Sequence, residues 1–363
     1  MTVRVGIRAD ASVNIGTGHI RRCAEIAREL VNRGAEVTFL CRDLGLDCRK
    51  LIAEVSASLI VLPPPSEPFA VQRYLPVHAP WAEVSWQTDA EQSEAALGQL
   101  KPDLVVIDHY AFDYRWHGRL RSALGCAVVA LDDLGDRPLD VELIIDHNYC
   151  ADHAAKHEIS DRFGPRILGG PSFALLSAAY GDLPQFHVAE TLESVGIFMG
   201  GSDAANHSEW ALDAVRLGLP RGISIELVTT SANPHLDRIK EILARDPKCT
   251  LTIDLPNLAT FFQRHDLQIG AGGGATWERC CAGAPTVAIG FADNHRPVLA
   301  PLDELGVLTF VREGDTDIHS LAAAVGALAA DVDKRRQMSI HARRLVDGRG
   351  IARVGDEIYA LAA

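Results

Sequence analysis

Residues 3–34 read VRVGIRADASVNIGTGHIRRCAEIARELVNRG, and this stretch decides the fold of the first half of the chain. Its Val/Ile-rich start predicts a buried strand, Gly16 and Gly18 predict a tight turn, and the apolar spacing after them predicts an amphipathic helix. A strand, a glycine turn and a helix form the first unit of a doubly wound α/β domain. The dinucleotide fingerprint needs a third glycine, but Arg21 stands in its place. The turn therefore favours an anion at a helix N-terminus over a nicotinamide cofactor.

Apolar runs alternate with helical patterns along the whole chain, and the alternation restarts after about residue 190. Continuous Val/Ile/Leu runs are typical of parallel strands that have helices on both faces. The runs in the first half are residues 3–9, 36–41, 58–63, 103–108, 127–133 and 141–146. Those in the second half are residues 194–200, 224–230, 250–254, 267–270, 286–290 and 307–311. The sequence therefore predicts an α/β protein of two facing, doubly wound Rossmann-like domains.

The length of the chain also favours two domains, because 363 residues exceed what one hydrophobic core organises efficiently. The Gly- and Pro-rich stretch at 162–186 is the expected connection. We place the boundary near residue 185, with an N-terminal domain over 1–185 and a C-terminal domain over 186–345. The helical pattern at 346–363 can cross back to the first domain. Ligands of open α/β sheets bind beyond the carboxyl ends of the strands, so an inter-domain cleft is the expected site.

Composition and charge exclude several classes of function. The formal net charge of -13 argues against a sequence-independent nucleic-acid binder and against binding to anionic membranes, because both need a basic field. The first residues lack the pattern of a signal peptide, and no apolar run reaches the roughly 18 residues of a membrane span. The eight cysteines include no Cys-x-x-Cys pair and are predicted to be reduced packing residues. A cytoplasmic location is therefore predicted.

His19 follows the glycine turn and is predicted to lie in the first turn of the helix. The helix dipole disfavours the imidazolium form there, so the ring is expected to be neutral, as a general base must be. A polar residue that merely begins the helix is the structural alternative. The residue types alone leave both interpretations open.

The second half opens with a similar strand and glycine turn. Gly200, Gly201, Ser202 and Asp203 stand between the apolar run and a helical pattern. Their backbone N–H groups can cradle an anion, as in the first half. Ser202 or Asp203 can instead be the N-cap of the helix, and the sequence does not decide between these interpretations.

A third glycine turn, Gly272 to Gly274, follows the run at 267–270 and opens a helix with Ala275, Thr276 and Glu278 near its start. A diphosphate would repel a carboxylate beside it. Glu278 therefore fits hydrogen bonds from vicinal ribose hydroxyls better than contact with phosphate. The structural alternative is a glutamate that stabilises the helix dipole.

Polar side chains end several of the predicted strands, where site residues of α/β proteins collect. Asp10 ends the first strand, the run Asp108–Tyr110 ends another, and Asp132–Asp133 follows the next. Asn294 and His295 follow the run at 286–290 and offer hydrogen-bond donors near a sugar. Strand ends are also where a chain meets water, so these patterns are weaker signals than the glycine turns.

Five motifs, in this order and at these separations, resemble the UDP-2,4-diacetamido-2,4,6-trideoxy-β-L-altropyranose hydrolase family of pseudaminic acid biosynthesis. The resemblance spans most of the chain, and the first and last motifs are long enough to be specific. It implies the GT-B fold of the MurG-like glycosyltransferases, many of which share the glycine-rich loop and its glutamate. The motifs are RADASVNIGTGHIRRCAEIA (8–27), DHY (108–110), LDD (131–133), GGSDAANHSEWAL (200–212) and IGAGGGATWERCCAGAPTVAI (269–289).

The resemblance implies that the N-terminal domain holds the sugar and that the C-terminal domain holds the UDP. His19 matches the catalytic histidine of the family, Asp10 a neighbouring motif aspartate, and Tyr110 the tyrosine of an Asp-x-Tyr motif. These three are the expected catalytic residues. Gly16 and Gly18 belong to the same motif as His19 and are expected to bind the substrate.

Asn294 matches the first residue of an Asn-Gln pair that approaches the sugar or the diphosphate in the family. Two positions depart from the pattern: His295 stands where the family usually has Gln, and Ser177 stands where Arg commonly follows paired leucines. Both departures bear on the identity of the sugar more than on the reaction. The other expected substrate-binding residues are Gly200, Gly201, Ser202, Asp203, Gly273, Gly274, Ala275, Thr276 and Glu278.

The implied reaction is hydrolysis of the anomeric C–O bond of a UDP-linked diacetamido-trideoxyhexose by water, with inversion. The expected partners are therefore the UDP-sugar and water, with no nucleic acid, cofactor or metal ion. Two alternatives stay open: a GT-B glycosyltransferase that passes the sugar of a UDP-amino-sugar to an alcohol, and a non-catalytic subunit that binds a UDP-sugar.

Overall fold

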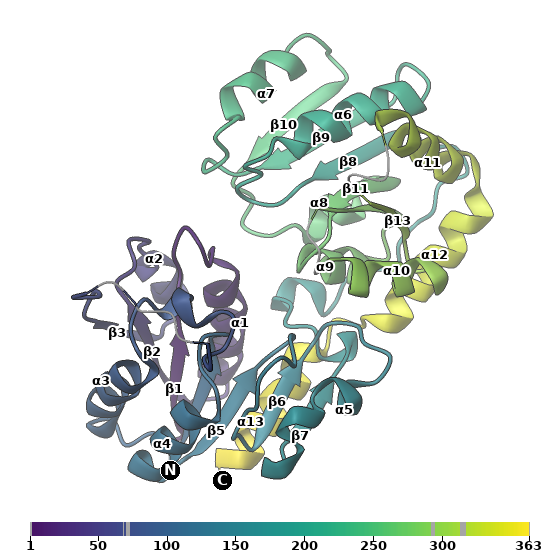
Figure 1. Ribbon diagram of the computed structural model, residues 1–363. Helices are drawn as coiled ribbons and strands as arrows, with labels where there is room; N and C mark the ends of the chain where they lie inside the picture. The colour runs from purple at the N-terminus through teal and green to yellow at the C-terminus, as the bar shows by residue number, and fades with distance from the viewer. Residues whose placement is uncertain (1, 68, 70–72, 292–294, 313–316, 363) are drawn as a thin grey trace. The chain divides into compact units, whose positions relative to one another are not determined.

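The chain forms two compact units (Figure 1). The computed structural model describes residues 2–67, 69, 73–291, 295–312 and 317–362. The first unit comprises Met1–Ser177 and Arg349–Ala363, and the second comprises Ala178–Gly348. The chain thus leaves the first unit after Ser177, a few residues before the predicted boundary near residue 185, and returns to it after Gly348.

A seven-stranded parallel sheet in the order β3-β2-β1-β4-β5-β6-β7 forms the centre of the first unit. Every strand predicted for this half is present, and one further strand, β7, lies in the Gly- and Pro-rich stretch that was predicted to be a connection. The strands are β1 Arg4–Ala9, β2 Glu36–Arg42, β3 Ser58–Leu62, β4 Leu104–Asp108, β5 Ala127–Leu131, β6 Leu143–Asp146 and β7 Arg166–Gly169. The helices are α1 Gly18–Asn32, α2 Arg49–Ala53, α3 Trp86–Gly98, α4 Tyr114–Leu124, α5 His153–Lys156 and α13 Gly350–Ala362, with 3₁₀ turns η1 Ala79–Ala82, η2 Glu158–Phe163 and η3 Pro171–Phe173.

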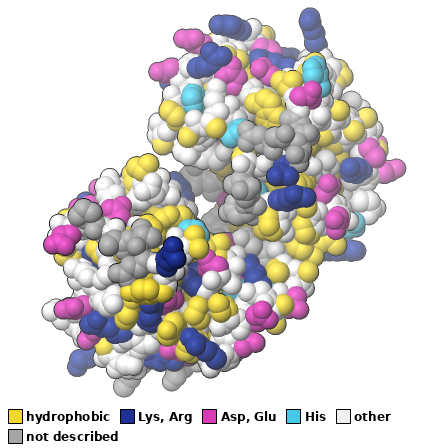
Figure 2. Space-filling model, in the orientation of Figure 1, with side chains coloured by type: hydrophobic (Ala, Val, Ile, Leu, Met, Phe, Trp, Pro, Cys, Tyr) yellow, Lys and Arg dark blue, Asp and Glu magenta, His cyan; other side chains and the backbone are white. Residues whose placement is uncertain are grey.

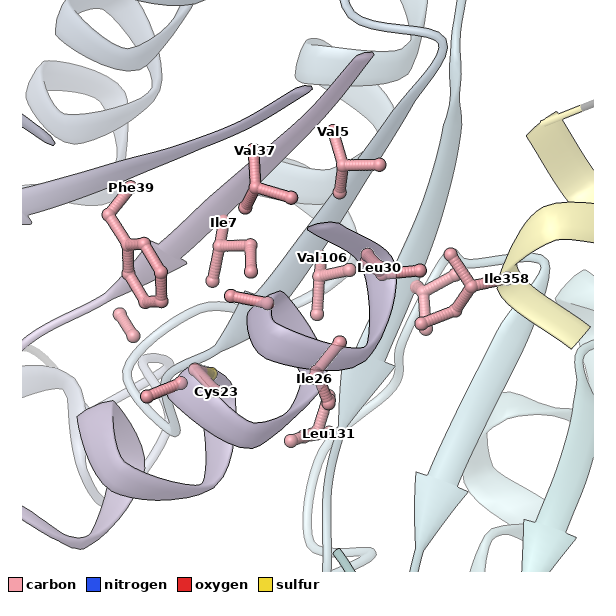
Figure 3. Close-up of a cluster of buried hydrophobic side chains, with 14 of the residues drawn as sticks. Val5, Ile7, Cys23, Ile26, Leu30, Val37, Phe39, Val106, Leu131 and Ile358 are labelled. Carbon is pink, nitrogen blue, oxygen red and sulfur yellow. The ribbon is translucent and has the colours of Figure 1, made fainter. Parts of the chain in front are cut away.

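Helices cover both faces of this sheet. On one face, Leu30 of α1 and Ile358 of α13 share a buried cluster with Val106 of β4 (Figure 3). The neighbours of Val106 in β4, Val105 and Ile107, belong to a different cluster that includes residues of α3 and α4. Successive side chains of a strand point to opposite faces, which explains why β4 reads as a continuous apolar run.

The second unit contains a six-stranded parallel sheet in the order β10-β9-β8-β11-β12-β13. All six strands overlap the predicted runs. They are β8 Ser194–Phe198, β9 Ser224–Thr229, β10 Cys249–Ile253, β11 Leu267–Ala271, β12 Thr286–Gly290 and β13 Thr309–Arg312. The helices are α6 His207–Gly218, α7 Leu236–Leu243, α8 Ala259–Gln263, α9 Ala275–Ala282, α10 Arg296–Glu304, α11 Ile318–Ala330 and α12 Val332–Leu345, with the 3₁₀ turn η4 Ala178–Tyr180.

Each sheet has one point at which the strand order reverses direction. In the first sheet, β1 pairs with both β2 and β4, so the chain segments after β1 and β4 emerge side by side. In the second sheet, β8 pairs with both β9 and β11 in the same way. Ligands of open α/β sheets bind at such switch points, beyond the carboxyl ends of the strands. His19 follows β1, and the two glycine turns of the second half follow β8 and β11.

Cysteines and surface charge agree with an ordinary packed protein. All eight cysteines are free thiols. Acidic and basic side chains are interspersed over the face that Figure 2 shows. Within the described residues, no helix combines the length and the apolar character that crossing a membrane requires.

Candidate functional site

His19 and Asp108 form a buried pair at the switch point of the first sheet. His19 is the second residue of α1, Asp108 is the last residue of β4, and His19 Nδ1 lies 2.6 Å from Asp108 Oδ1. A carboxylate can only accept, so Nδ1 carries the hydrogen of this bond. Nε2 has no hydrogen-bond partner within the described part of the chain, which leaves its lone pair free to accept a proton. The pair therefore has the geometry of an oriented general base.

Arg22 completes this pair from the next turn of α1. Its Nε and Nη2 each donate to one oxygen of Asp108 at 2.6 Å, so the guanidinium binds the carboxylate through a bidentate pair of hydrogen bonds. Burial alone would raise the pKa of the Asp108 carboxyl, but the charge of Arg22, and then that of His19, hold the pKa well below its ordinary value. Asp108 is therefore an anion at neutral pH, and its position is fixed by Arg22.

Tyr110 stands beside the His19–Asp108 pair and belongs to a second polar chain. Its ring meets the His19 ring edge-on, with 4.8 Å between centroids. Its hydroxyl donates to Asp133 and accepts from Arg22 Nη2 at 3.1 Å. Asn148 Nδ2 donates to the other oxygen of Asp133 at 2.8 Å. Burial raises the pKa of Tyr110 well above its ordinary value. The charge of Arg22 opposes this shift, and the charge of Asp133 adds to it. Tyr110 is therefore a neutral hydrogen-bonding group at neutral pH.

Asp10 lies behind this site in a fully buried ionic network. It has no exposed surface. Arg8 Nη2 donates to it at 2.8 Å, the backbone N–H of Arg42 donates at 2.7 Å, and His109 Nε2 lies 3.2 Å away. Arg8 also pairs with Asp89 of α3 at 2.6 Å. These contacts join the ends of β1, β2 and β4, so the burial of Asp10 favours a positioning role over contact with a substrate.

The glycine turn before α1 is folded onto its own chain. Gly16, with φ +74°, donates its N–H to the carbonyl of Ser12 at 2.7 Å. The Ser12 hydroxyl accepts from the N–H groups of Asn14 and Ile15 at 3.2 Å. Gly18 is the first residue of α1. Since three N–H groups of the turn bond to Ser12, the turn presents His19 rather than an anion cradle.

In the second unit, the loop after β11 has the features expected of an anion site. Gly273 has φ +112° and is exposed, as is Gly274. The N–H of Gly272 bonds to Ile289. Among the described residues, the N–H groups of Gly273, Gly274 and Ala275 have no hydrogen-bond partner. They precede α9 or begin it, where free N–H groups and the helix dipole favour an anion.

A buried cation lies behind this loop. Arg279 of α9 is 1% exposed, and its Nη2 donates to the carbonyl of Ala271 at 2.8 Å and to Thr276 Oγ1 at 3.2 Å. Its Nε and Nη1 have no partner in the part of the chain that the structure describes. Burial lowers the pKa of Arg279 to about 10, so the guanidinium is still charged at neutral pH. Thr276 is buried against it and is more a support of the loop than an exposed donor.

Glu278 has a neighbour within its own unit. Burial, and then the charge of Glu278, raise the pKa of the Tyr180 hydroxyl well above its ordinary value. Tyr180, at the end of η4, is 1% exposed, whereas Glu278 is half-buried. Ribose binding by Glu278 stays a prediction, and packing against Tyr180 is the competing role.

The loop after β8 is capped by its own aspartate. The two oxygens of Asp203 accept from the N–H groups of His207 and Ser208, at 2.8 and 3.0 Å. The carbonyl of Gly201 accepts from Thr230 Oγ1 at 2.6 Å, and Gly200 has φ +96°. Asp203 therefore occupies the first free N–H groups of α6 with negative charge, which favours the capping interpretation of this residue. No contact from Ser202 contributes to this cap.

His295 meets the glycine loop, whereas Asn294 lies outside the described residues. A Cβ on Gly272 would stand 2.9 Å from Cγ and Nδ1 of the His295 ring, so this glycine makes room for the ring. Burial lowers the pKa of His295, which keeps the ring neutral. Ser177, the other departure from the family pattern, has a buried hydroxyl without a partner in the described part of the chain.

The structure thus brings together His19 and Tyr110 in the first unit, and Gly272–Glu278 with His295 in the second. The described residues include no group of three or more His, Cys, Asp or Glu side chains placed to hold a metal ion. Arg22 and Asp133 were not among the predicted site residues, although Arg22 lies three positions after His19 on one helix face, which was an available signal. Nothing in the sequence pattern pointed to Asn148 or Arg279.

Comparison with known sequences shows distant relatives and no matching family model. The spore coat polysaccharide biosynthesis protein SpsG of Bacillus subtilis (strain 168) is 19% identical over 358 residues, which covers 97% of this chain and 96% of SpsG. The UDP-2,4-diacetamido-2,4,6-trideoxy-beta-L-altropyranose hydrolase of Campylobacter jejuni is 24% identical over 257 residues, which covers 71% of this chain and 80% of that protein.

Solved structures resemble the chain over nearly its full length. MurG of Acinetobacter baumannii superposes with a TM-score of 0.69 at 13% identity and covers 99% of both chains. The calicheamicin glycosyltransferase CalG4 superposes with a TM-score of 0.66 at 17% identity and covers 99% of this chain and 98% of its own. These likenesses confirm the predicted fold class. The chain thus has the two parallel α/β domains of GT-B glycosyltransferases and weak similarity to a spore coat protein and a UDP-sugar hydrolase.

Proposed function

We propose that the chain hydrolyses the anomeric C–O bond of a UDP-linked 2,4-diacetamido-2,4,6-trideoxyhexose, with inversion, to release UDP and the free sugar for pseudaminic acid synthesis. The observation that carries the proposal is the fixed orientation of His19, whose Nδ1 is held by Asp108 while Nε2 is left for a proton. The weak similarity to the UDP-diacetamido-altropyranose hydrolase supports the choice of substrate. A cytoplasmic location stays a prediction.

In the proposed step, His19 Nε2 takes a proton from water as the water oxygen forms a bond to the anomeric carbon. The bond from that carbon to the diphosphate oxygen breaks, and its electron pair leaves with UDP. Asp108 stabilises the imidazolium, which then returns its proton to solvent. Attack opposite to the leaving group inverts the anomeric centre. One base suffices because diphosphate, once held, leaves without the acid that ordinary glycosidases need.

The second unit is proposed to hold the UDP. The N–H groups at the start of α9 and the buried charge of Arg279 would stabilise the negative charge that builds up on the departing diphosphate. In this proposal, Glu278 accepts hydrogen bonds from the ribose hydroxyls. The proposal assigns charge stabilisation to these groups and calls for no metal ion.

Tyr110 and Asp10 are proposed to act differently from His19. The Tyr110 hydroxyl already donates to Asp133, so it orients the site and lines it rather than accepting a proton. Asp10 is buried and acts through Arg8 and His109 as a positioning residue.

The direct test is UDP release from a panel of UDP-amino-sugars, with purified protein and no acceptor. The proposal requires multiple turnovers with a diacetamido-trideoxy donor and a product of inverted anomeric configuration, observed by NMR before it mutarotates. Binding of the UDP-sugar without turnover at high protein concentration would contradict the proposal and support a non-catalytic subunit.

His19→Asn keeps a polar side chain of similar reach but removes the base. We expect turnover to fall by roughly 10²-fold or more, the range of positioned acid–base catalysis, while the dissociation constant of UDP is unchanged. Steady-state kinetics and calorimetry measure the two effects. A rate within a few-fold of the parent would end the catalytic assignment, and an unchanged kcat with a raised KM would make His19 a binding residue.

A glycosyltransferase is the second candidate, favoured by the full-length likeness to MurG and CalG4. Such an enzyme would release UDP slowly from the donor alone and rapidly once an alcohol acceptor is present. A rate that does not respond to alcohols supports the hydrolase.

A further inference from the structure

Two further rings lie against His19 and Tyr110. The Trp81 ring, from η1, meets the His19 ring edge-on with 6.1 Å between centroids and lies 5.7 Å from the Tyr110 ring. The His78 ring lies 4.6 Å from Trp81 and 5.6 Å from Tyr110. We call His78 and Trp81 the aromatic wall. The proposed hydrolysis assigns neither of them a role.

The aromatic wall is more exposed than the pair it covers. His19 and Tyr110 are each 8% exposed, while His78 and Trp81 are only half-buried. By contrast, Trp116 and Trp277 are fully enclosed in the cores of the two units. Trp81 thus presents apolar surface to solvent directly beside the proposed base, which is where a glycosyl group would lie.

The segment that carries the wall is held in place. Ala79 and Ala82 are buried beneath it. The N–H of Ala79 bonds to the carbonyl of Pro76 at 2.9 Å, and that of Trp81 bonds to His78 at 3.0 Å. Pro76 and Pro80 have fixed backbone φ angles. A preorganised ring loses little entropy when a ligand stacks on it.

The chemistry of the wall selects among sugars. Burial lowers the pKa of His78, so the wall is neutral as well as aromatic. A hydroxyl placed against an indole face loses its hydrogen bonds to water, whereas a methyl group gains by leaving water. Trp81 is half-buried, and its indole N–H is a donor that suits an amide carbonyl.

We infer that the aromatic wall lines the glycosyl subsite and selects donors that carry deoxy and acetamido groups over fully hydroxylated hexosyl donors. Methyl groups of the sugar pack on Trp81, and one acetamido carbonyl accepts from its indole N–H. This inference rests on the proposed function, because it assumes that the substrate is a UDP-sugar whose reacting carbon lies near His19.

The test compares Trp81→Ala and Trp81→Phe with the parent. Trp86→Ala is the matched control, since Trp86 is also half-buried and packs under Arg115. The kcat/KM is measured for a UDP-2,4-diacetamido-2,4,6-trideoxyhexose and for the fully hydroxylated donor UDP-glucose, and the dissociation constant of UDP is measured by calorimetry. The readout is the ratio of the two kcat/KM values, which a general loss of folding would not change.

We expect Trp81→Ala to reduce this ratio by roughly 10- to 100-fold, because each lost methyl contact is worth about a factor of 10 or more. The kcat/KM of Trp81→Phe should fall less, because the ring remains. Neither variant, nor Trp86→Ala, should change the dissociation constant of UDP.

A ratio for Trp81→Ala within twofold of the parent overturns the inference and leaves the hydrolase proposal intact. If the parent releases no UDP from either donor, the hydrolase proposal fails, and the same variants are compared by the dissociation constants of the UDP-sugars relative to that of UDP. In that case, weaker binding of the diacetamido donor to Trp81→Ala than to the parent, relative to the binding of UDP, supports the inference about the aromatic wall. Unchanged relative dissociation constants overturn it.

Discussion

Asp108 serves two side chains at once, and that arrangement governs how the residues of the first unit act together. It accepts from His19 Nδ1 with one oxygen and is gripped by Arg22 with both. A carboxylate that is held from a second direction fixes the ring plane of its histidine more firmly than one that is free to rotate. Arg22 is therefore a positioning residue for the proposed base.

Asp108→Asn tests the orienting bond. The amide keeps the shape of the side chain but loses the charge that stabilises the imidazolium, so we expect turnover to fall by roughly 10²- to 10⁴-fold. Asp133→Asn is the control, because Asp133 contacts Arg22 and Tyr110 without touching His19. Steady-state kinetics on both variants checks the prediction. Equal losses in the two would mean that the network supports the fold rather than the base.

Glu278→Ala tests the ribose assignment in the second unit. If Glu278 accepts hydrogen bonds from the ribose, its loss should weaken the binding of UDP by about 1 to 3 kcal/mol. This is the usual effect of leaving hydrogen-bonding groups unpaired. Tyr180→Phe removes the neighbouring hydroxyl and should leave the affinity for UDP unchanged. Calorimetry with UDP decides. Equal affinity in Glu278→Ala and the parent would assign Glu278 to packing against Tyr180.

Sequence patterns predict individual site residues better than the pairs that they form. The glycine turn and strand ends point to His19 and Tyr110. They do not reveal that Arg22 pairs with Asp108 or that Asn148 bonds to Asp133, because these contacts join segments far apart in the chain. The same limit applies to Asp203, whose capping role depends on where the loop places its oxygens.

Among the elements, helices α6 and α11 approach each other closely at one point. A Cβ on Gly218, at the end of α6, would stand 2.3 Å from the carbonyl oxygen of Ala322 in α11. A Cβ on Gly326 of α11 would stand 2.9 Å from the carbonyl of Gly218. The two glycines allow the backbones to touch, and this packing supports the sheet from which β8 leads into its loop.

Gly218→Ala should therefore force α6 and α11 apart. Because the obstacle is backbone rather than a flexible side chain, we expect a loss of about 1 to 3 kcal/mol in the free energy of unfolding. Gly98→Ala, at the end of α3, is the control: no atom lies within 4 Å of its added Cβ. There, alanine should be neutral or slightly stabilising. Denaturant titration of both variants measures the difference, and equal stabilities would contradict the predicted clash.

Element boundaries were predictable where the pattern was long and apolar. All strands except β7 follow from Val/Ile/Leu runs. The four residues of β7 lie between Gly164-Pro165 and Gly170-Pro171, whose turn signals outweigh so short a run. The 3₁₀ turn η1 has no periodicity at all, which is why Trp81 escaped notice. A tryptophan that directly follows a proline, Pro80, in an irregular segment was the one available signal.

For the whole molecule, pH should act on the first unit in particular. His117 in α4 is buried, and burial, followed by the charges of Arg137 and Arg121, lowers its pKa from 6.5 to about 3. His147 is similarly lowered to about 4. Below pH 6.5 these histidines bind protons in the unfolded chain but stay neutral in the folded unit. Protonation therefore favours the unfolded chain, and the free energy of unfolding decreases as the pH falls from 6.5 toward these pKa values.

Removal of one such group should reduce this loss. The free energy of unfolding decreases between pH 7 and pH 4. From the size of the pKa shift, we expect this decrease to be smaller in His117→Leu than in the parent by on the order of 3 kcal/mol. Exposed His319→Leu should behave as the parent. Denaturant titrations at the two pH values provide the measurement. The same decrease in all three proteins would show that His117 does not couple folding to protons.

The return of residues 349–363 to the first unit has a consequence for the order of folding during synthesis. Helix α13 contributes Val354 and Ile358 to the cluster under β1 and β4. A ribosome completes all of Ala178–Gly348 before it makes that helix. The domain that begins first is therefore finished last, and in the interval α1 and its neighbours expose the apolar surface that α13 will cover. Chaperone binding to nascent chains should accordingly persist until α13 emerges and then cease.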